Sequence, residues 1–152
     1  MNISAKSDYA IRAMLVLAEK GGDRPVKGET LATAQEIPVK FLENILLDLR
    51  RAGLVASQRG AEGGYRLNRA ADAITLAEVI RAVDGPLANI RGLRPEAASY
   101  TGPAESLRDV WVAMRAAMRS VLEAVTLADV ANGSLPPVVK SLLEGDDVWQ
   151  PH

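Results

Sequence analysis

Cysteine is absent from the 152-residue sequence, and histidine occurs once, as the last residue, His152. Disulfides and cysteine-ligated zinc or iron–sulfur sites are therefore excluded, and a histidine-based metal cluster or catalytic triad has nothing to be built from. The chain also lacks an apolar run long enough to span a membrane, and its N-terminus lacks the hydrophobic region of a signal peptide. We expect a cytoplasmic protein with no metal, no other cofactor and no membrane partner.

Catalytic chemistry has little support in the sequence. An enzyme needs a nucleophile or an acid–base pair in a cleft, or a glycine-rich phosphate loop that precedes a helix. The glycine-rich residues 60–65 lead into a predicted strand instead. We expect that the protein is not an enzyme.

Charge is distributed unevenly along a chain whose composition, 48% hydrophobic and 24% charged residues, is that of a soluble globular protein. Residues 1–70 hold 11 Lys and Arg against 8 Asp and Glu, a net charge of +3, whereas residues 71–152 hold 7 against 11, a net charge of −4. A basic first half and an acidic second half suit a DNA-binding segment joined to a partner-binding or regulatory segment. The length allows one domain, or one compact domain with an extension.

The most informative stretch is residues 38–67. It opens with a predicted helix that begins at Pro38, a residue suited to the first helical position, and ends at Gly53, a left-handed cap. Apolar residues repeat along this helix at the three- and four-residue spacing of one buried stripe: Leu42, Ile45, Leu46 and Leu49. A strand-like run at 54–56, a reversal with glycines at 60, 63 and 64, and a second strand at 65–67 then predict a hairpin.

Two helices precede this stretch. The apolar pattern predicts them over residues 7–20 and 28–34, with a turn at 35–37 before the third helix. This order is that of a helix-turn-helix unit, whose second helix enters the major groove of DNA. The predicted fold class is therefore mostly α with a small β-hairpin wing, a winged helix-turn-helix.

The second half of the chain contains a further capped helix and a long helix. Thr75 caps a helix through Val83, with Glu78 completing a capping box. A heptad seam marks the long helix: Leu107, Trp111, Met114, Met118, Val121 and Val125. Because little chain remains to bury this seam, we expect it to pair with the same helix of a second subunit, with packing on its own domain as the alternative.

The predicted domain organisation has three parts. Residues 1–86 form the winged helix-turn-helix DNA-binding domain, residues 87–103 form a loop without a clear period, and residues 104–152 hold the dimerisation helix and C-terminal helices. Thr126 and Pro136 begin short helices in the last part, and the residues from Glu144 onward are expected to fray.

The exposed face of the third helix carries candidate DNA-contacting residues. Lys40 suits a phosphate or a guanine edge, Glu43 a cytosine amino group, and Asn44 an adenine. An ordinary solvated face is the alternative for any one of them alone. Arg59, beside glycines at the hairpin tip, is placed to enter a minor groove, and Arg66 is placed for phosphates. Lys27 and Thr30, near a helix N-terminus, suit phosphates as well.

Residues 4–18, 37–67, 74–87 and 126–130 together carry a resemblance, above all the string AGLVASQRGAEGGYRL followed by AVDG. The chain resembles bacterial winged-helix regulators of the Rrf2 (Rrf-two) family, the kind that includes IscR, NsrR and CymR. The resemblance implies a homodimer in which a long helix crosses its partner. It also implies that the start of the third helix, Pro38 to Glu43, contacts the bases and that Arg59 is the wing arginine. The full predicted DNA-contacting set is Lys27, Thr30, Pro38, Val39, Lys40, Glu43, Asn44, Arg51, Arg59, Gly60, Gly63, Gly64 and Arg66.

One departure from the family pattern concerns the signal. Iron–sulfur members of the family carry three cysteines in the loop before the dimerisation helix, and residues 89–100 here contain neither cysteine nor histidine. The chain thus resembles the cluster-free branch, for which a small molecule or a partner protein is the expected signal. The predicted effector pocket, for an anionic or aromatic molecule, comprises Arg91, Arg94, Tyr100 and Trp111. The alternative is that the tryptophan belongs to the core and the arginines are merely solvated.

We therefore expect a sequence-specific transcriptional regulator, a repressor, that binds a double-stranded DNA operator as a homodimer without an iron–sulfur cluster. The alternative is a winged-helix protein–protein interaction adaptor without sequence-specific DNA binding. The salt dependence of binding distinguishes the regulator from the adaptor, because DNA binding weakens steeply as phosphate contacts are screened.

Overall fold

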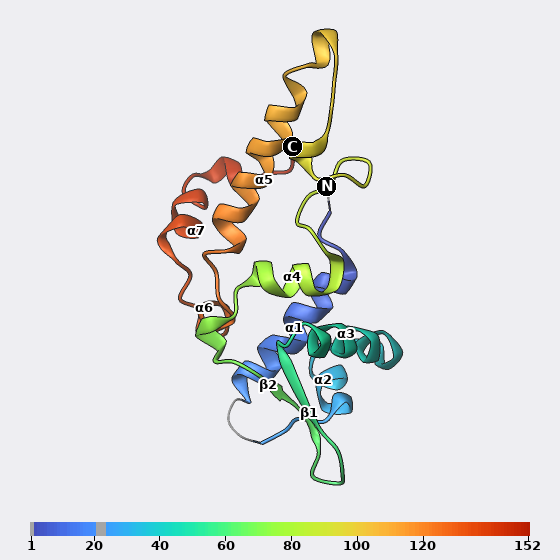
Figure 1. Cartoon of the computed structure of the whole chain (residues 1–152). Helices are drawn as coiled ribbons and strands as arrows, with labels where there is room; N and C mark the ends of the chain where they lie inside the picture. Colours follow the sequence, from blue (N-terminus) through green and yellow to red (C-terminus); the bar gives the residue numbers. More distant parts are fainter. Residues whose placement is uncertain (1, 21–23) are drawn as a thin grey trace.

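The computed structural model describes residues 2–20 and 24–152 and has the predicted fold class, helical with a two-stranded antiparallel hairpin (Figure 1). The helices and strands in chain order are α1 (Ala5–Glu19), α2 (Gly28–Gln35), α3 (Val39–Arg51), β1 (Val55–Gln58), β2 (Gly64–Leu67), α4 (Leu76–Asp84), α5 (Leu107–Leu122), α6 (Leu127–Ala131) and α7 (Pro137–Leu142). Short 3-10 turns lie at Ala71–Ala73, Pro95–Ala97, Gly102–Ala104 and Asp146–Trp149. Among the described residues, no helix is long and apolar enough to cross a membrane.

The core lies in the lower part of Figure 1, where α1 packs against α2, α3, α4 and α6. We call this part the body. Each of these five helices contributes large, fully buried side chains to it: Met14, Leu31, Leu42, Ile45, Leu46, Leu49, Val79 and Leu127. α6 thus returns to the body after α5, and its Leu127 belongs to the same apolar cluster as Met14.

The predicted stripe on α3 is confirmed, since Leu42, Ile45, Leu46 and Leu49 are all buried. Pro38 is the residue before the helix and not its first residue, because its backbone is still extended (ψ 127°) while its carbonyl accepts the N–H of Leu42. Gly53 follows α3 with φ +76°, the left-handed conformation predicted for it. The first strand begins after Leu54 and not at it, although Leu54 is buried.

A short segment before α2 also pairs with the hairpin. β1 pairs with β2 with Val55 opposite Leu67 and Gln58 opposite Gly64. Val26 then forms a bridge to Tyr65 through two backbone hydrogen bonds of 2.7 Å, on the other side of β2. This bridge fastens the wing to the segment before α2, so the wing and the helix-turn-helix unit form one body.

The capping box of α4 is confirmed, with Thr75 accepting from the N–H of Glu78 and the Glu78 carboxylate accepting from the N–H of Thr75. The other end of α4 is held by Asp84, whose carboxylate accepts hydrogen bonds from the hydroxyls of Ser4 and Ser7. Ser7 is only 1% exposed, and this bond satisfies a hydroxyl that would otherwise be buried without a partner.

The long helix is shorter than predicted. α5 ends at Leu122, and Val125 lies beyond it, 3% exposed and inside the body. Its carbonyl accepts the N–H of Leu76, and the N–H of Leu127 donates to the carbonyl of Ile74. The extension of the heptad seam to Val125 was therefore wrong. The physical reason is the capping box of Thr126 and Asp129, which starts α6 and leaves Val125 in the connection that returns to α4.

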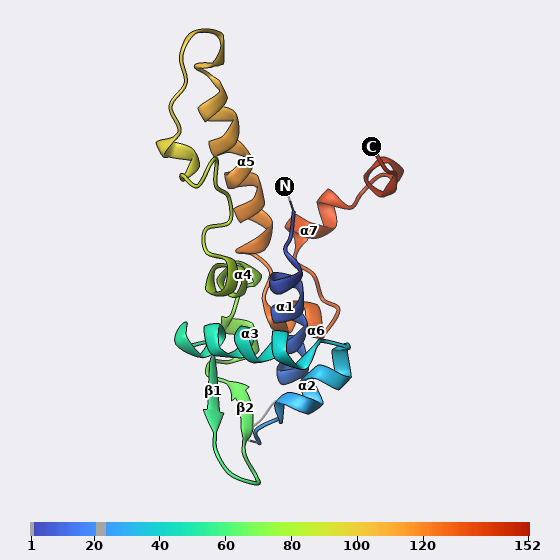
Figure 2. The same ribbon diagram turned by 90° about the vertical axis from the view of Figure 1, so that its right-hand side faces the viewer.

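The upper half of the molecule, α5, α7 and the loops beside them, is less tightly packed. None of the residues of α5 and α7, all of which are described, is buried. Asp146–Trp149, within the stretch predicted to fray, form a 3-10 turn after α7. Figure 2 shows this terminal segment leading away from α5.

Candidate nucleic-acid interface

The start of α3 presents a polar face to solvent. Lys40, Glu43 and Asn44 are all exposed, on the side of the helix opposite the buried stripe. Val39 is half exposed at 50%, at the first position of the helix. The turn into α3 contains Glu36 with φ +52°, and this left-handed residue reverses the chain between α2 and α3.

A cleft of about 320 Å³ joins the start of α3 to the start of α2 and to the wing. Its lining includes Lys27, Val39 and Glu43 from the predicted set, with Tyr65 of β2 forming the wall on the wing side. The structure therefore brings these three predicted residues together, although they come from two different helices. Thr30, also predicted, is exposed in the first turn of α2.

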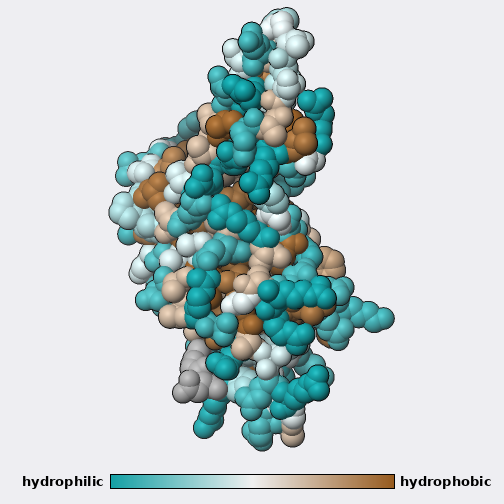
Figure 3. Space-filling model, in the orientation of Figure 1, coloured by the Kyte–Doolittle hydropathy of each residue, from teal (hydrophilic) through white to brown (hydrophobic). Residues whose placement is uncertain are grey.

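The wing tip carries Arg59 and Gly60, both exposed, and Arg66 is exposed on β2 opposite Ala56. Figure 3 shows hydrophilic residues covering this lower end of the molecule, whereas apolar residues gather nearer its middle. The tip and the start of α3 belong to the same body, so both can approach one nucleic-acid duplex.

At positions 63 and 64 close packing of the backbone requires glycine. A Cβ on Gly63 would lie 2.2 Å from the carbonyl oxygen of Gln58, and one on Gly64 would lie 2.5 Å from the carbonyl oxygen of Val26. No side chain fits at such distances. These two glycines shape the wing, while Gly60, with φ +105° and nothing within 4 Å of its Cβ position, is glycine for its backbone conformation alone.

Arg51 is separated from the other predicted residues. It is exposed at the last position of α3, about 17 Å along the helix from Lys40. The neighbouring Arg50, which sequence reasoning missed, donates a 3.2 Å hydrogen bond to the hydroxyl of Ser57 on β1. Nothing in the local pattern distinguished Arg50 from Arg51, because the hairpin that brings Ser57 to it is a tertiary feature.

Sequence reasoning also missed the residues that hold α3 in place. Tyr9 of α1 packs edge-to-face on Phe41, with ring centroids 5.6 Å apart. Lys6 of α1 forms a 2.6 Å ion pair with Asp48, near the other end of α3. A third contact holds the turn, where Arg12 donates to the carbonyl of Gln35 at 2.9 Å. These contacts fix the orientation of α3 at both of its ends, and the apolar periodicity of α1 gave no signal for them.

The four residues of the predicted effector pocket do not line one pocket. Trp111 donates from Nε1 to the Tyr100 hydroxyl at 3.0 Å, and the guanidinium of Arg91 lies over the Tyr100 ring at 5.6 Å. Trp111 faces a cavity of about 590 Å³, whereas Arg94 lines a separate cleft of about 500 Å³. Only Arg91, Tyr100 and Trp111 are therefore neighbours.

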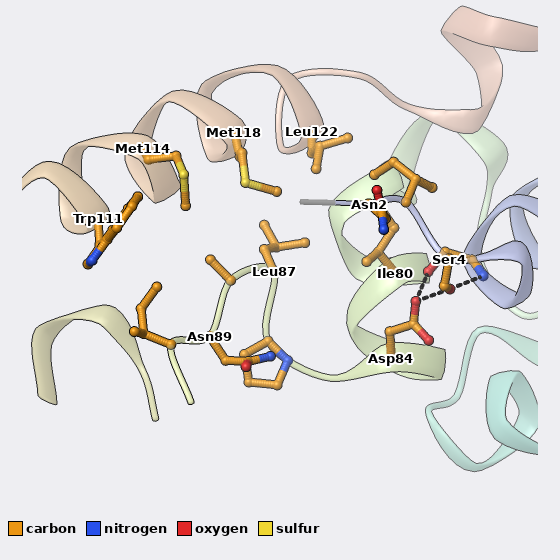
Figure 4. Close-up of a pocket in the computed structure, with 15 residues that line it drawn as sticks. Asn2, Ser4, Ile80, Asp84, Leu87, Asn89, Trp111, Met114, Met118 and Leu122 are labelled. Carbon is orange, nitrogen blue, oxygen red and sulfur yellow. Dashed lines mark hydrogen bonds between the residues drawn. The ribbon is translucent and has the colours of Figure 1, made fainter. Parts of the chain in front are cut away.

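The larger cavity lies between α5 and α4. Figure 4 shows Trp111, Met114, Met118 and Leu122 of α5 along one side, with Leu87 facing them and Asp84, bonded to Ser4, at the far end. The cavity thus has an apolar wall and a polar floor. It borders both the body, through α4, and the long helix of the upper half.

The profile of the Rrf2 family, described as "Iron-dependent Transcriptional regulator", matches residues 3–133. An iron site does not fit the residues present. Within residues 2–20 and 24–152, no group of three or more His, Cys, Asp or Glu side chains is placed to hold a metal. In the loop before α5 the carboxylate of Glu96 is engaged by Arg115.

Relatives agree with the profile over most of the chain. The sequence is 51% identical over 144 residues to Rv1287 of Mycobacterium tuberculosis, a protein provisionally named as an HTH-type transcriptional regulator, covering 95% of this chain and 89% of that one. It is 38% identical over 132 residues to the HTH-type transcriptional regulator CymR of Bacillus subtilis, covering 87% and 91%.

The solved structure of CymR, the global cysteine regulator of B. subtilis, superposes with a TM-score of 0.74 at 36% identity, covering 88% of this chain and 98% of that one. Fold, sequence and the family profile agree, and the family is one of regulators and not of enzymes. The chain belongs to the Rrf2 family of helix-turn-helix, DNA-binding transcriptional regulators.

Proposed function

We propose that the protein is a repressor that binds a specific double-stranded operator as a homodimer. The single observation that carries the proposal is the exposed face of Lys40, Glu43 and Asn44 on α3 beside the glycine-rich wing, which the Val26–Tyr65 bridge joins to the segment before α2. A helix of this kind inserts its N-terminal residues into the major groove, and the wing reaches the adjacent minor groove.

The predicted residues then divide by role. Lys40, Glu43 and Asn44 face base edges from α3, and Arg59 enters the minor groove from the wing tip. Lys27 at the start of α2, with Arg66 on the wing, contacts phosphates, which position the protein without selecting a sequence. Arg51 lies too far along α3 to contact the same bases as Lys40, and we assign it to backbone phosphates.

The homodimer is supported by the exposed side of α5. Val110 is 54% exposed, and Ala113 and Ala117 are exposed one and two turns further along the same side. Small side chains allow two helices to approach closely, and Met114 and Val121 border this stripe. Trp111, Met114 and Met118 of the predicted seam line their own chain's cavity instead, so we place the pairing surface on the Val110 side of α5.

The signal we propose is a small molecule or a partner protein. The cavity between α4 and α5 is where a small molecule would be sensed, because α4 packs on α3 in the body and α5 forms the dimer contact. A titration of metabolites monitored by Trp111 fluorescence tests this assignment. The absence of any saturable change across the panel would contradict it.

An adaptor that binds protein through the same surface is the alternative, and one observation favours it. Val39 and Phe41, both apolar, are exposed at the start of α3, and exposed apolar side chains suit a protein partner better than a phosphate backbone.

A titration of the purified protein with fragments of its own genomic neighbourhood, at two salt concentrations, decides between them. Repressor function predicts sequence-selective binding by a dimer that weakens steeply with salt. Weak binding that is indifferent to sequence, in the presence and absence of a small-molecule extract, would favour the adaptor.

A further inference from the structure

The last residues of the chain form a segment whose exposure the regulator fold does not explain. Residues 134–152, here called the C-terminal arm, follow the part matched by the family profile, which ends at residue 133. Large apolar side chains of the arm are strongly exposed, Trp149 at 68% and Leu142 at 55%, together with Leu143 and Val148. Such a concentration of exposed apolar side chains in so short a segment marks an interaction surface.

The arm nevertheless has a defined backbone. α7 is followed by Gly145 with φ +102°, and the 3-10 turn after it closes with a 3.0 Å hydrogen bond from the N–H of Gln150 to the carbonyl of Asp147. A one-turn helix of this kind is marginal in water by itself. Figure 2 shows the turn standing apart from α5, and Val148 and Trp149 in it are exposed.

The charge of the arm indicates which kind of surface suits it. The arm carries Glu144, Asp146 and Asp147 next to its apolar residues. The upper half borders a cleft of about 500 Å³, here called the arginine cleft, lined by Arg81 of α4, Arg94 and Glu96 of the loop, and Arg115 and Arg119 of α5. Pro86 and Leu87 form an apolar part of the same lining.

The arginine cleft holds more positive charge than its own carboxylates neutralise. Arg81 and Arg119 share one carboxylate, that of Glu123, at 2.6 and 3.0 Å. Arg115 pairs with Glu96, and Arg94 has no ion pair within residues 2–20 and 24–152. Hydrogen bonds from Arg119 and then Arg81 lower the pKa of Glu123, as expected of a carboxylate in a positive field. Four arginines therefore face two carboxylates.

We propose that the C-terminal arm of one protomer docks in the arginine cleft of a second copy of the chain. Asp146 and Asp147 complement the unneutralised arginines, and Trp149 packs on the apolar part beside Leu87. α7 packs against its own α5, but the turn after it stands apart from α5. We therefore assign the contact to a second subunit, and two-fold symmetry makes the two copies exchange arms equally. This inference rests on the homodimer proposed above and adds to it a second contact, distinct from the α5 stripe.

Charge reversal in trans provides the test. An arm-reversed chain carries Asp146→Lys and Asp147→Lys, and a cleft-reversed chain carries Arg94→Glu and Arg119→Glu. All four positions are exposed, so the fold should tolerate these changes. Each variant alone should dimerise roughly ten-fold more weakly than the wild type in sedimentation equilibrium, since every arm then meets a like charge.

Mixing the two variants is the decisive step. In the mixed dimer the reversed arm meets the reversed cleft and the unchanged arm meets the unchanged cleft, so dimer affinity should return. A matched control, Arg91→Glu with Arg108→Glu, reverses two arginines of the same half that do not line the cleft. Mixing this control with the arm-reversed chain should not raise the dimer affinity above that of the arm-reversed chain alone.

Trp149 reports the docking directly, because the chain contains only two tryptophans. The difference in acrylamide quenching between the wild type and Trp149→Phe isolates its signal, which should be protected in the dimer and become accessible on dilution.

A mixture that dimerises no better than either variant would overturn the inference, and so would a dimer in which Trp149 stays fully quenchable. In both cases operator binding by the same samples would leave the proposed function standing. A wild-type chain that is monomeric at every concentration would overturn the arm contact and the proposed homodimer together.

Discussion

The body and the upper half of this molecule differ in how completely each buries its own apolar residues. In the body, Met14, Leu49 and Leu127 come from three helices and are all fully buried. In the upper half, α5 and α7 contain no buried residue, and Val110 and Trp149 are exposed. The body therefore has an apolar core of its own, whereas the upper half leaves apolar side chains exposed, which we propose a second chain covers. Four predictions test this difference.

The largest expected effect is on the stability of the body. Leu49→Ala should lower the free energy of unfolding by about 2–5 kcal/mol, because it removes a fully buried side chain and leaves a cavity. Leu142→Ala is the matched change in the upper half, and it should alter stability by no more than about 0.5 kcal/mol in the monomer. Urea denaturation at low protein concentration measures both. Equal losses would mean that the arm is packed within its own chain.

The wing offers a comparison within the body. Gly63→Ala should destabilise the wing by about 1–3 kcal/mol, since its Cβ would clash with the carbonyl oxygen of Gln58. Gly60→Ala has open space and should cost only about 1 kcal/mol, from its positive φ. Hydrogen exchange of the β1–β2 amides measures the local opening. A Gly60 variant that opens as readily as the Gly63 variant would show that backbone conformation, and not packing, governs the wing.

Operator affinity separates the two regions by function. Arg59→Ala should weaken operator binding by about 1–3 kcal/mol if the side chain contacts a groove, and should leave stability unchanged because it is exposed. Lys140→Ala, an exposed cation of α7, should leave operator affinity nearly unchanged. Fluorescence anisotropy with a labelled operator measures both. An Arg59 variant with wild-type affinity would remove the wing tip from the interface.

The smallest effect concerns acid stability. Burial alone would raise the pKa of Glu78, but the N–H of Thr75 and the guanidinium of Arg69, which hydrogen-bond its carboxylate, together lower it below its ordinary value of 4.5. A lowered pKa in the folded state means that the charge stabilises the fold above pH 4.5, and that this contribution is lost as the pH falls from there through the lowered value.

Glu78→Gln keeps the capping box, since glutamine also completes it, but loses the ion pair with Arg69. Its stability should therefore fall below that of the wild type by only a few tenths of a kcal/mol at neutral pH, and the difference should vanish in acid. Thermal unfolding across pH 3–7 (a range of about four units around the ordinary glutamate pKa) measures this, with Glu62→Gln on the exposed wing as the control. A difference independent of pH would assign the effect to the cap and not to the charge.

The sequence by itself determined every feature whose cause is local. The stripe from Leu42 to Leu49 and the left-handed Gly53 follow from helical periodicity and from glycine's backbone freedom. The boxes begun by Thr75 and Thr126 depend only on residues three positions apart. The resemblance to the Rrf2 family rested on the same local strings, and it is confirmed over residues 3–133.

The tertiary structure decided the features that depend on distant residues. Val125 continues a heptad in the sequence, yet it lies in the body, because its carbonyl accepts the N–H of Leu76 and α6 begins directly after it. Gly64 is a glycine because Val26, far before it in the chain, lies against its backbone. Trp111 faces its own chain's cavity and Trp149 faces solvent, which no spacing distinguishes. Periodicity predicts that a side chain needs a partner, and only the packed chain determines which partner it finds.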